Sequence, residues 1–444
     1  MCSPVLRTVL CLLPLVVPAA GVDWPEWRGP GGQGHAGTNV HHLPTHWSES
    51  ENIVWKCPLP GRAWSSPVID GDSIWLSTAL EMPATPEDTQ RRLKANTSDQ
   101  PLTLLAQVEL RALCVDRQTG QLRHNLSLLT EVDPQWVHQL NSYASPTPVL
   151  EAGRAYFHFG TFGTVAVDTR SGAIVWTNRS LKIMHENGPG SSPILAGDLL
   201  VFHLDGSDTQ SIVALKKSTG ELAWRTPRSG KMADHPQLKK SYATPALVSL
   251  DGRPVLLSQG ADWLYAYDPQ DGHERWRWPY GSLGFSLSSR AVFGAGMMYL
   301  CTGYTRSELQ AIQLPEGTNE VHRVWKYTKG APTMSSPLLI GDALYFVGDS
   351  GGFLTCLDAA TGAEIYRERL GGSHSASPLY ADGHIYVSDQ AGDTCVINPG
   401  RTLQVVARNP LPGKIMASPA AVGDSLYIRT DAALYRIADR TRTR

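Results

Sequence analysis

The chain contains one glycine-rich stretch with the residue types of a nucleophilic site. GDSGG (348–352) could expose Ser350 as a nucleophile in a tight turn. No other block of the sequence supplies a histidine and an aspartate in the matching arrangement. Two apolar runs, ALYFV and FLTCL, flank the stretch, and a hairpin between two strands needs such a turn. We therefore interpret GDSGG as a hairpin turn.

Two other groups have the residue types of metal ligands. His41, His42 and His46 follow a glycine-rich segment, and Asp205 and Asp208 lie in the turn DGSD, where they could bind Ca²⁺. The histidines have no predicted helix or strand to fix them. The aspartates are typical of an ordinary turn. We predict an exposed arm and a turn, and no metal site.

A third set of residues stands at fixed distances before a recurring proline. Five places before it stand Arg62, Asn141, Gly188, Lys240, Phe285, Pro332, Ser373 and Lys414; three places before stand Trp64, Tyr143, Gly190, Tyr242, Leu287, Met334, Ser375 and Met416. His138, His185, Asn187 and His374 lie alongside. Aromatic rings and cations gathered in this way suit a planar or anionic ligand. The alternative is that the rings pack between structural units and the lysines are solvated.

These residues can meet only if a repeat places them, and the sequence contains one. The pattern small-small-Pro, strand, Gly-Asp, strand recurs with the anchors Pro67, Pro146, Pro193, Pro245, Arg290 in the proline place, Pro337, Pro378 and Pro419. Most copies continue with a strand ending in Asp, a glycine turn and a final aromatic strand, as in LTCLDAATGAEIY (354–366). A four-strand unit with a period of about 40 to 50 residues predicts a propeller blade. The fold class is therefore all-β, an eight-bladed β-propeller, and the anchors of its blades meet around one mouth of the central channel. A charge at 290 in place of the consensus residue points to a site there.

The last repeat stops after ALYRI and lacks its fourth strand, whereas NIVWKCPL (52–59) at the other end matches that strand. Pairing residues 52–59 with the C-terminal unit would close the ring and remove two exposed edges. The predicted divisions are a signal peptide (1–21), a Gly-rich arm (22–51), the propeller (52–437) with an insertion at 80–107 in blade 1, and a basic tail (438–444). The insertion is expected to form a flap on one face, either as a lid or partner-docking element or as a variable decoration.

Composition supports this division and restricts the partners. The chain has 41 Gly, 31 Pro and 13 Trp with 18% charged residues, a balance typical of short strands and tight turns. Its net charge of −2 predicts no nucleic-acid partner. Arg7, the apolar run 9–17 and small residues at 19–21 are typical of a cleaved secretory signal, and no other run could span a membrane. We expect an exported, periplasmic or extracellular monomer.

The repeats resemble the pyrroloquinoline-quinone-like (PQQ-like) β-propeller repeat family, which includes quinoprotein alcohol dehydrogenases and a scaffold lipoprotein of outer-membrane barrel assembly. The resemblance covers nearly all of residues 52–437. In the dehydrogenases it implies PQQ bound with Ca²⁺, a disulfide of adjacent cysteines over the quinone, a stacked Trp, and Glu, Asn and Asp ligands. This chain has no adjacent cysteines, and Cys114, Cys356 and Cys395 replace small core residues of other repeats. We expect buried free thiols and no bound quinone.

The sequence thus predicts an exported binding or scaffold protein without catalytic residues, whose partner is a protein or a small anionic or planar ligand. The alternative is a quinone-dependent dehydrogenase with a divergent site, and a further one is a polysaccharide hydrolase or lyase, which would need paired carboxylates at the mouth. The predicted ligand-binding residues at the mouth are Arg62, Trp64, Asn141, Tyr143, Asn187, Lys240, Tyr242, Arg290, His374 and Lys414. The recurrent Trp176, Trp224, Trp276 and Trp325 are predicted to dock neighbouring blades instead.

Overall fold

The computed structural model describes residues 23–94, 100–281, 284–304, 306–315, 320–349 and 351–441. The predicted signal peptide, Ser350 of GDSGG and the last residues of the basic tail lie outside the described residues.

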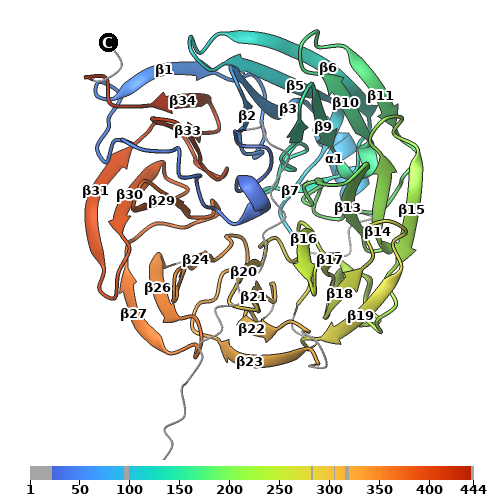
Figure 1. Cartoon of the computed structure of the whole chain (residues 1–444). Coiled ribbons are helices and arrows are strands. Elements are labelled where there is room, and N and C mark those ends of the chain that lie inside the picture. The colour runs from blue at the N-terminus through green and yellow to red at the C-terminus, as the bar shows by residue number, and fades with distance from the viewer. Residues whose placement is uncertain are drawn as a thin grey trace, which may run out of the picture.

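Eight four-stranded antiparallel sheets form a ring around a central channel, as predicted (Figure 1). Blade 1 is β2 (Val68–Asp70), β3 (Ser73–Pro83), β5 (Leu105–Asp116) and β6 (Leu122–Val132); blade 2 is β8 (Val149–Glu151), β9 (Arg154–His158), β10 (Thr164–Asp168) and β11 (Ile174–Asn178). Blade 3 is β12 (Ile194–Ala196), β13 (Leu199–Asp205), β14 (Gln210–Lys216) and β15 (Leu222–Pro227); blade 4 is β16 (Ala246–Leu250), β17 (Arg253–Gln259), β18 (Trp263–Tyr267) and β19 (Glu274–Pro279). Blade 5 is β20 (Val292–Gly294), β21 (Met297–Cys301), β22 (Leu309–Gln313) and β23 (His322–Tyr327); blade 6 is β24 (Leu338–Ile340), β25 (Ala343–Val347), β26 (Phe353–Asp358) and β27 (Glu364–Arg369). Blade 7 is β28 (Leu379–Ala381), β29 (His384–Ser388), β30 (Asp393–Asn398) and β31 (Gln404–Pro410). Blade 8 is β32 (Ala420–Val422), β33 (Ser425–Arg429), β34 (Ala433–Ile437) and β1 (Ile53–Pro58).

The ring closes through the N-terminal strand. β1 pairs antiparallel with β34, from Ile53 opposite Ile437 to Pro58 opposite Ala433. The predicted closure is therefore confirmed, with strand bounds that lie within the predicted segment. A shared final blade leaves neither chain end with an open sheet edge in the ring.

Neighbouring blades dock through tryptophans of the outer strands, as predicted for Trp176, Trp224 and Trp325. The Trp176 indole on β11 donates a hydrogen bond to the carbonyl of Lys217 in blade 3, at 2.7 Å. Its ring lies against Gly220 of the turn after β14, where a Cβ would overlap the indole. Gly220 has a φ of 74°. Glycine is needed in this turn both for its conformation and for the close approach of the ring. The same arrangement recurs at Trp55, Trp224 and Trp325, over Gly120, Gly272 and Gly362.

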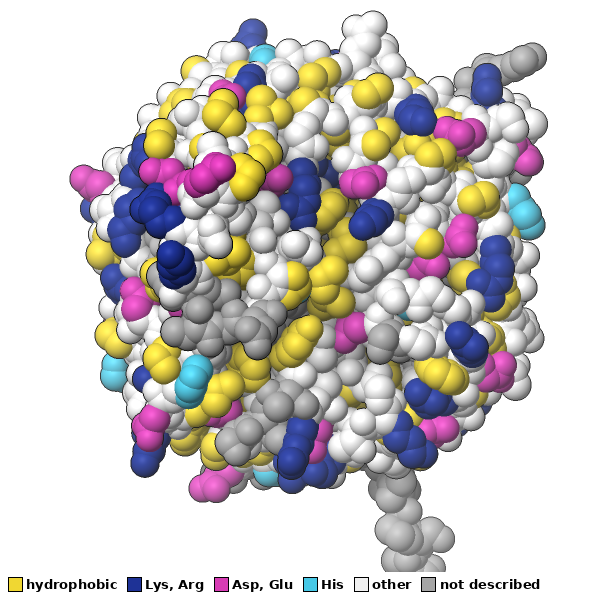
Figure 2. Space-filling view, turned by 180° about the vertical axis from the view of Figure 1, so that it is seen from behind, with side chains coloured by type: hydrophobic (Ala, Val, Ile, Leu, Met, Phe, Trp, Pro, Cys, Tyr) yellow, Lys and Arg dark blue, Asp and Glu magenta, His cyan; other side chains and the backbone are white. Residues whose placement is uncertain are grey.

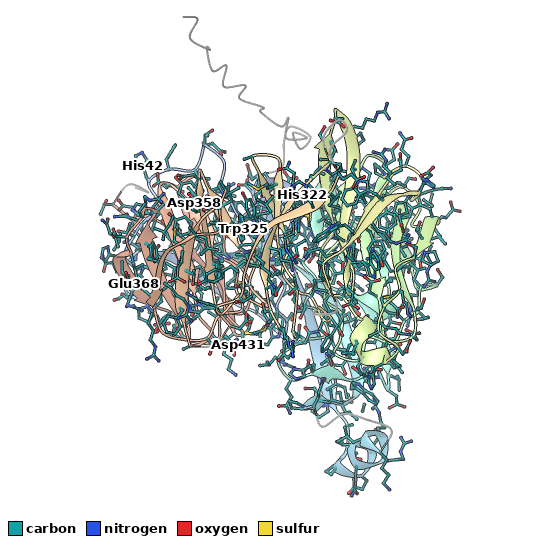
Figure 3. The ribbon with its side chains drawn as sticks, turned by 90° about the horizontal axis from the view of Figure 1, so that it is seen from below. His42, His322, Trp325, Asp358, Glu368 and Asp431 are labelled. Atoms are coloured by element: carbon teal, nitrogen blue, oxygen red, sulfur yellow. The ribbon has the colours of Figure 1, made fainter. Side chains whose placement is uncertain are left out.

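The insertion in blade 1 extends the blade and adds a helix. β3 and β5 stay paired as far as Pro83 and Leu105, and α1 (Pro86–Leu93) follows β3. The Thr85 hydroxyl caps α1 by accepting a hydrogen bond from the Asp88 amide, at 3.2 Å. A short strand β4 (Leu102–Thr103) then pairs with β7 (Val137–His138), which ties the insertion to the loop before blade 2. The helix projects from the body on the side opposite His42 (Figure 3).

The N-terminal arm, residues 23–51, is a folded part of the core on the other side of the ring. Trp24 is 1% exposed and pairs with Ile69 through backbone hydrogen bonds. The short 3₁₀ helix η1 (Pro30–Gly32) lies over the middle of the ring in Figure 1. The Trp47 amide donates to Asn409 Oδ1, at 3.0 Å, in blade 7. The arm thus bridges blades that are far apart in sequence. His41, His42 and His46 are exposed on it, as expected.

The described cysteines Cys57, Cys114, Cys301, Cys356 and Cys395 are buried free thiols, which confirms the prediction for the three of them that the repeat aligned. Cys2 and Cys11 lie outside the described residues. Burial raises the pKa of the Cys114 thiol to about 11, because the thiolate would lose its hydration.

Candidate functional site

A ring of side-chain hydroxyls joins the inner strands around the channel. In seven of the eight blades, the residue two places before the inner strand donates its backbone N–H to the hydroxyl of the corresponding residue in the next blade, at 2.9 to 3.0 Å. The hydroxyls that accept these hydrogen bonds belong to Ser66, Thr147, Ser192, Thr244, Ser336, Ser377 and Ser418. The Ser418 amide donates to Ser66 and so carries the chain of hydrogen bonds across the ring closure.

This ring corrects two of the predicted anchors. β8 begins at Val149, so Pro148 and not Pro146 occupies the proline place of blade 2. The sequence Pro-Thr-Pro offers two candidates, and strand pairing selects the second. In blade 5, Val292 pairs with Tyr299 as Leu338 pairs with Tyr345 in blade 6. This register places Ala291 in the proline place and Arg290 in the hydroxyl place, one residue away from the prediction.

Arg290 interrupts the hydroxyl ring and holds the N-terminal arm. Its guanidinium is 2.8 Å from Glu26 Oε2 and donates to the Trp27 carbonyl at 3.0 Å. The side chain is only 2% exposed, and Gly32 leaves room for it, since a Cβ at Gly32 would overlap the guanidinium. Arg28 donates to the Pro337 carbonyl at 2.7 Å, and burial lowers its pKa to about 9. The ion pair and the hydrogen bond of Arg290 therefore hold the N-terminal arm in place.

The arm turns the channel into a cavity that opens on the opposite face. The cavity has a volume of about 370 Å³, and its lining includes the Trp27 side chain together with ring hydroxyls of Ser66, Thr147, Ser192 and Ser418. The Trp27 indole lies 3.4 Å from the Ser418 hydroxyl, to which it donates. Figure 2 shows this face, with yellow hydrophobic side chains in a hollow near its middle.

Four of the ten predicted mouth residues line the cavity: Trp64, Asn141, Asn187 and Tyr242. Asn141 Nδ2 donates to the carbonyls of Asn187 and Pro189, at 2.8 and 3.1 Å, which connects the mouth loops of blades 2 and 3. The Tyr242 hydroxyl donates to the His185 carbonyl at 2.6 Å. Asn141 and Tyr242 therefore belong to a cavity wall in which the side-chain amide and hydroxyl donate to backbone carbonyls.

Two further predicted residues lie beside the cavity without lining it. Arg62 donates to the carbonyls of Gln139 and Asn141, at 2.6 and 2.7 Å, and lies 5.3 Å from the Trp64 ring. Tyr143 is fully buried, and its hydroxyl donates to the Gln135 carbonyl at 2.9 Å. The shifted anchor explains Tyr143, because Ser145 and not Tyr143 stands three places before Pro148 and faces the cavity.

The remaining predicted residues are spread over the structure. Lys240 is fully buried, its ammonium donates to Gln237, and burial lowers its pKa to about 8. His374 is 2% exposed, with both ring nitrogens near backbone carbonyls. Lys414 is exposed, and its amide donates to Asp431. Arg62, Lys240 and Lys414, the cations predicted at the mouth together with Arg290, do not line the cavity.

The two motifs that could have carried a nucleophile or a metal ion, GDSGG (348–352) and DGSD (205–208), have structural roles. Gly348 and Gly351–Gly352 lie in the turn between the paired strands β25 and β26, as predicted for GDSGG. The Asp349 carboxylate accepts from Thr333 and Met334 amides, at 2.6 and 3.0 Å. No group of residues suited to a metal ion occurs among the described residues, the DGSD turn included.

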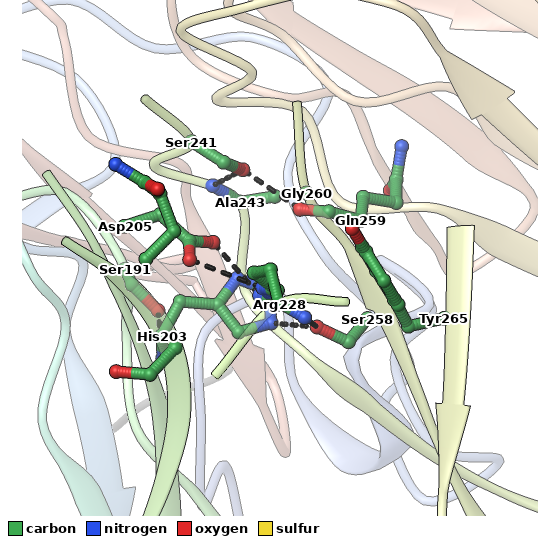
Figure 4. A network of polar contacts seen from close by, with 12 residues as sticks. Ser191, His203, Asp205, Arg228, Ser241, Ala243, Ser258, Gln259, Gly260 and Tyr265 are labelled. Atoms are coloured by element: carbon green, nitrogen blue, oxygen red, sulfur yellow. Dashed lines mark hydrogen bonds and ion pairs between the residues drawn. The ribbon is translucent and has the colours of Figure 1, made fainter. Parts of the chain in front are cut away.

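Asp205 belongs to a buried network between blades 3 and 4 (Figure 4). Arg228 binds its carboxylate at 2.7 Å and donates to the Ser258 hydroxyl at 2.6 Å, and that hydroxyl lies 2.7 Å from His203 Nε2. Both side chains of the ion pair are 1% exposed. Burial and the nearby Arg228 hold the pKa of His203 well below its usual value. The network fixes two blades and has no access for a substrate.

The lining of the cavity does not fit the quinone and calcium of the dehydrogenases. Among its described lining residues there is no carboxylate, lysine or arginine, so the acidic ligands of Ca²⁺ and the counter-charges of an anionic quinone are both missing. The polar groups are neutral hydroxyls, amides and the His138 ring.

The sequence interpretation missed the two features that shape this site. The hydroxyl ring could have been found, because a Ser or Thr precedes most of the anchors. No sequence pattern indicated that the N-terminal arm forms the floor of the cavity, because its partners Arg290 and Pro337 lie far away in the sequence.

Comparisons with known proteins relate the chain to one family. Residues 70–226, 110–353 and 305–439 match a family model described as "Outer membrane protein assembly factor BamB". The BamB of Moranella endobia is 24% identical over 56% of this chain and 61% of its own, and that of Legionella pneumophila 28% over 46% and 49%. The chain thus spans about half to three fifths of these two relatives. The BamB of Burkholderia pseudomallei is 25% identical over 81% and 93%.

Solved structures show the same fold. The crystal structure of BamB from Moraxella catarrhalis aligns with a TM-score of 0.55 and 14% identity, over 87% of this chain and 99% of that one. A europium-containing methanol dehydrogenase aligns with a TM-score of 0.52 and 10% identity, over 94% and 91%. Because an assembly factor and a dehydrogenase share this propeller, the fold alone does not select a function.

Proposed function

Because the chain belongs to the PQQ-like β-propeller repeat family whose model is described as outer membrane protein assembly factor BamB, we propose that it is an exported scaffold that binds a protein partner. The partner would bind on the face that carries the cavity mouth and the blade 1 insertion. Among the described residues, no helix has both the length and the apolar character that crossing a membrane requires.

The observation that carries the proposal is that the face with the cavity mouth combines an uncharged cavity lining with exposed apolar side chains at its rim. Among the described residues, the cavity lining has no carboxylate, lysine or arginine, and His138 is its one imidazole. Around the mouth, Leu140 is 47% exposed and Tyr304 57%, and Met82 on the insertion is 55% exposed. Apolar side chains gathered at the rim of a cavity are typical of protein interaction sites.

The test is photocrosslinking in the native host. Benzoylphenylalanine replaces Leu140 or Met82 on the mouth face, or exposed His42 on the opposite face as the matched control. We expect one partner protein crosslinked from both mouth-face positions and absent from the control, and the purified partner should then bind the purified chain. Absence of crosslinks from Leu140 and Met82, or equal crosslinking from His42, would contradict the proposal.

A parallel titration with PQQ and Ca²⁺ separates the scaffold from the dehydrogenase. Tryptophan fluorescence reports on binding because Trp27 and Trp64 both line the cavity. Saturable quenching at micromolar quinone, with alcohol-dependent dye reduction, would replace the scaffold proposal by the enzyme. We expect neither.

A further inference from the structure

The hydroxyls that line the cavity have unused donors. Ser66, Thr147 and Ser192 each accept a backbone N–H from the neighbouring blade, and no acceptor for their own O–H protons is found among the described residues. The Ser286 hydroxyl also lines the cavity; it is 8% exposed and has no partner among those residues. A buried donor without an acceptor is unfavourable, so these groups favour a ligand that brings an oxygen acceptor.

The walls above these hydroxyls are aromatic and uncharged. Trp64, Tyr242 and Phe285 face the cavity, and Met334 and Met416 add polarisable thioethers. Burial and the nearby Lys240 lower the pKa of His138, so the imidazole in this wall is neutral at pH 7. Aromatic rings and thioethers bind another ring favourably, whereas a charged group would lose its hydration without a counter-ion.

The volume of the cavity and its exposed rim indicate which kind of molecule carries the aromatic ring into the cavity. A volume of about 370 Å³ lies at the lower end of small-ligand sites, which measure roughly 300 to 1,000 Å³. A ligand wholly inside the cavity would leave Leu140 and Tyr304 exposed at the rim. A protein segment that inserts one side chain would fill the cavity and also cover the rim, which is the usual form of an interface anchor.

We propose that the cavity receives a tyrosine side chain of the protein partner, with its phenol oxygen on the floor hydroxyls and its ring between Trp64, Tyr242 and Phe285. This proposal rests on the proposed function and specifies the part of the partner that enters the channel. Trp27 then forms the floor against which the tyrosine stops, since the arm closes the far end.

The first test uses amino-acid amides as probes with the mature chain. Saturation-transfer NMR should detect binding of N-acetyl-tyrosinamide with a dissociation constant on the order of 1 mM, as expected for a ligand of this size. N-acetyl-phenylalaninamide should bind several-fold more weakly because it brings no oxygen to the floor, and N-acetyl-glutamate amide should bind at least tenfold more weakly. Equal signals from the three probes, or none from the tyrosine probe, would overturn the proposal.

The second test fills the cavity. Ser288 lines the cavity, and no side-chain hydrogen bond of Ser288 is found among the described residues. Ser288→Phe should therefore lower the affinity for the tyrosine probe at least tenfold. Ser218→Phe, on an exposed turn at the outside of the ring, is the matched control and should bind like the wild type. Thermal unfolding of both variants checks that they are folded.

The same variants distinguish this proposal from the broader one. If Ser288→Phe abolishes both probe binding and the crosslinks from Leu140 and Met82, the anchor is supported. If the crosslinks persist in a variant that no longer binds the probe, the tyrosine anchor is refuted and the scaffold function remains. If the wild type binds the probe and forms no crosslinks, the scaffold function fails, and with it the protein origin of the anchor.

Discussion

Replacing His185 by glutamine should remove a measurable share of the acid sensitivity of this protein. His185 is 2% exposed beside the cavity, and its Nε2 accepts a hydrogen bond from the Thr161 amide at 2.9 Å. An imidazolium cannot accept this bond, and the backbone at Gly160 lies directly against the ring. Burial accordingly lowers the pKa of His185 to about 3.

The sign and the size follow from proton linkage. The folded state keeps His185 neutral, whereas the unfolded chain binds a proton below its usual pKa of about 6.5. The contribution of His185 to stability is therefore complete above pH 6.5 and is lost as the pH falls from 6.5 towards 3. At roughly 1.4 kcal/mol per pH unit, the loss at pH 4.5 is about 3 kcal/mol.

The assay is urea unfolding of the wild type and His185→Gln at pH 7.5 and pH 4.5, followed by tryptophan fluorescence. Glutamine Oε1 can accept from Thr161 as Nε2 does but cannot bind a proton in this range. The variant should match the wild type at pH 7.5 within about 1 kcal/mol, and between the two pH values it should lose about 3 kcal/mol less. Other titrating groups cancel in this difference. An unchanged pH dependence, with equal m-values, would refute the reasoning.

Three other perturbations test the fold around the cavity. Arg290→Met should destabilise the protein by at least about 2 kcal/mol, because it leaves the carboxylate of the arm without its partner, and it should red-shift the emission of Trp27 as the arm loosens; unchanged emission would show that the arm is held by other contacts. Gly220→Ala should cost clearly more than Gly197→Ala, since both have positive φ but only Gly220 lies against the Trp176 ring, and equal losses in thermal unfolding would contradict the docking role of the tryptophan. The five described cysteines should react with a thiol reagent only after unfolding, because all are buried; rapid labelling of the folded protein would contradict that burial.

The fold could be predicted because every repeat carries its own local signals. The glycine turns, the alternating strands and the outer tryptophans each follow from backbone geometry and burial over a short window, and eight copies reinforce one another. The closing strand was predictable for the same reason, since NIVWKCPL (52–59) matches the fourth strand of the other units. The anchors of blades 2 and 5 were misplaced because a shift of one or two residues changes little in the sequence and is decided by strand register.

The sequence by itself determined the propeller, its eight blades, the buried thiols and four of the residues that line the cavity. The tertiary structure alone decided which of those residues meet. Arg290 binds the arm and Lys240 is sealed in the wall, because their partners Glu26 and Gln237 are set by chain crossings and loop paths that no periodicity records. A repeat specifies where each Cα lies on the ring, but the direction of a side chain depends on which neighbours it meets, and here the N-terminal arm supplies those neighbours at one end of the channel.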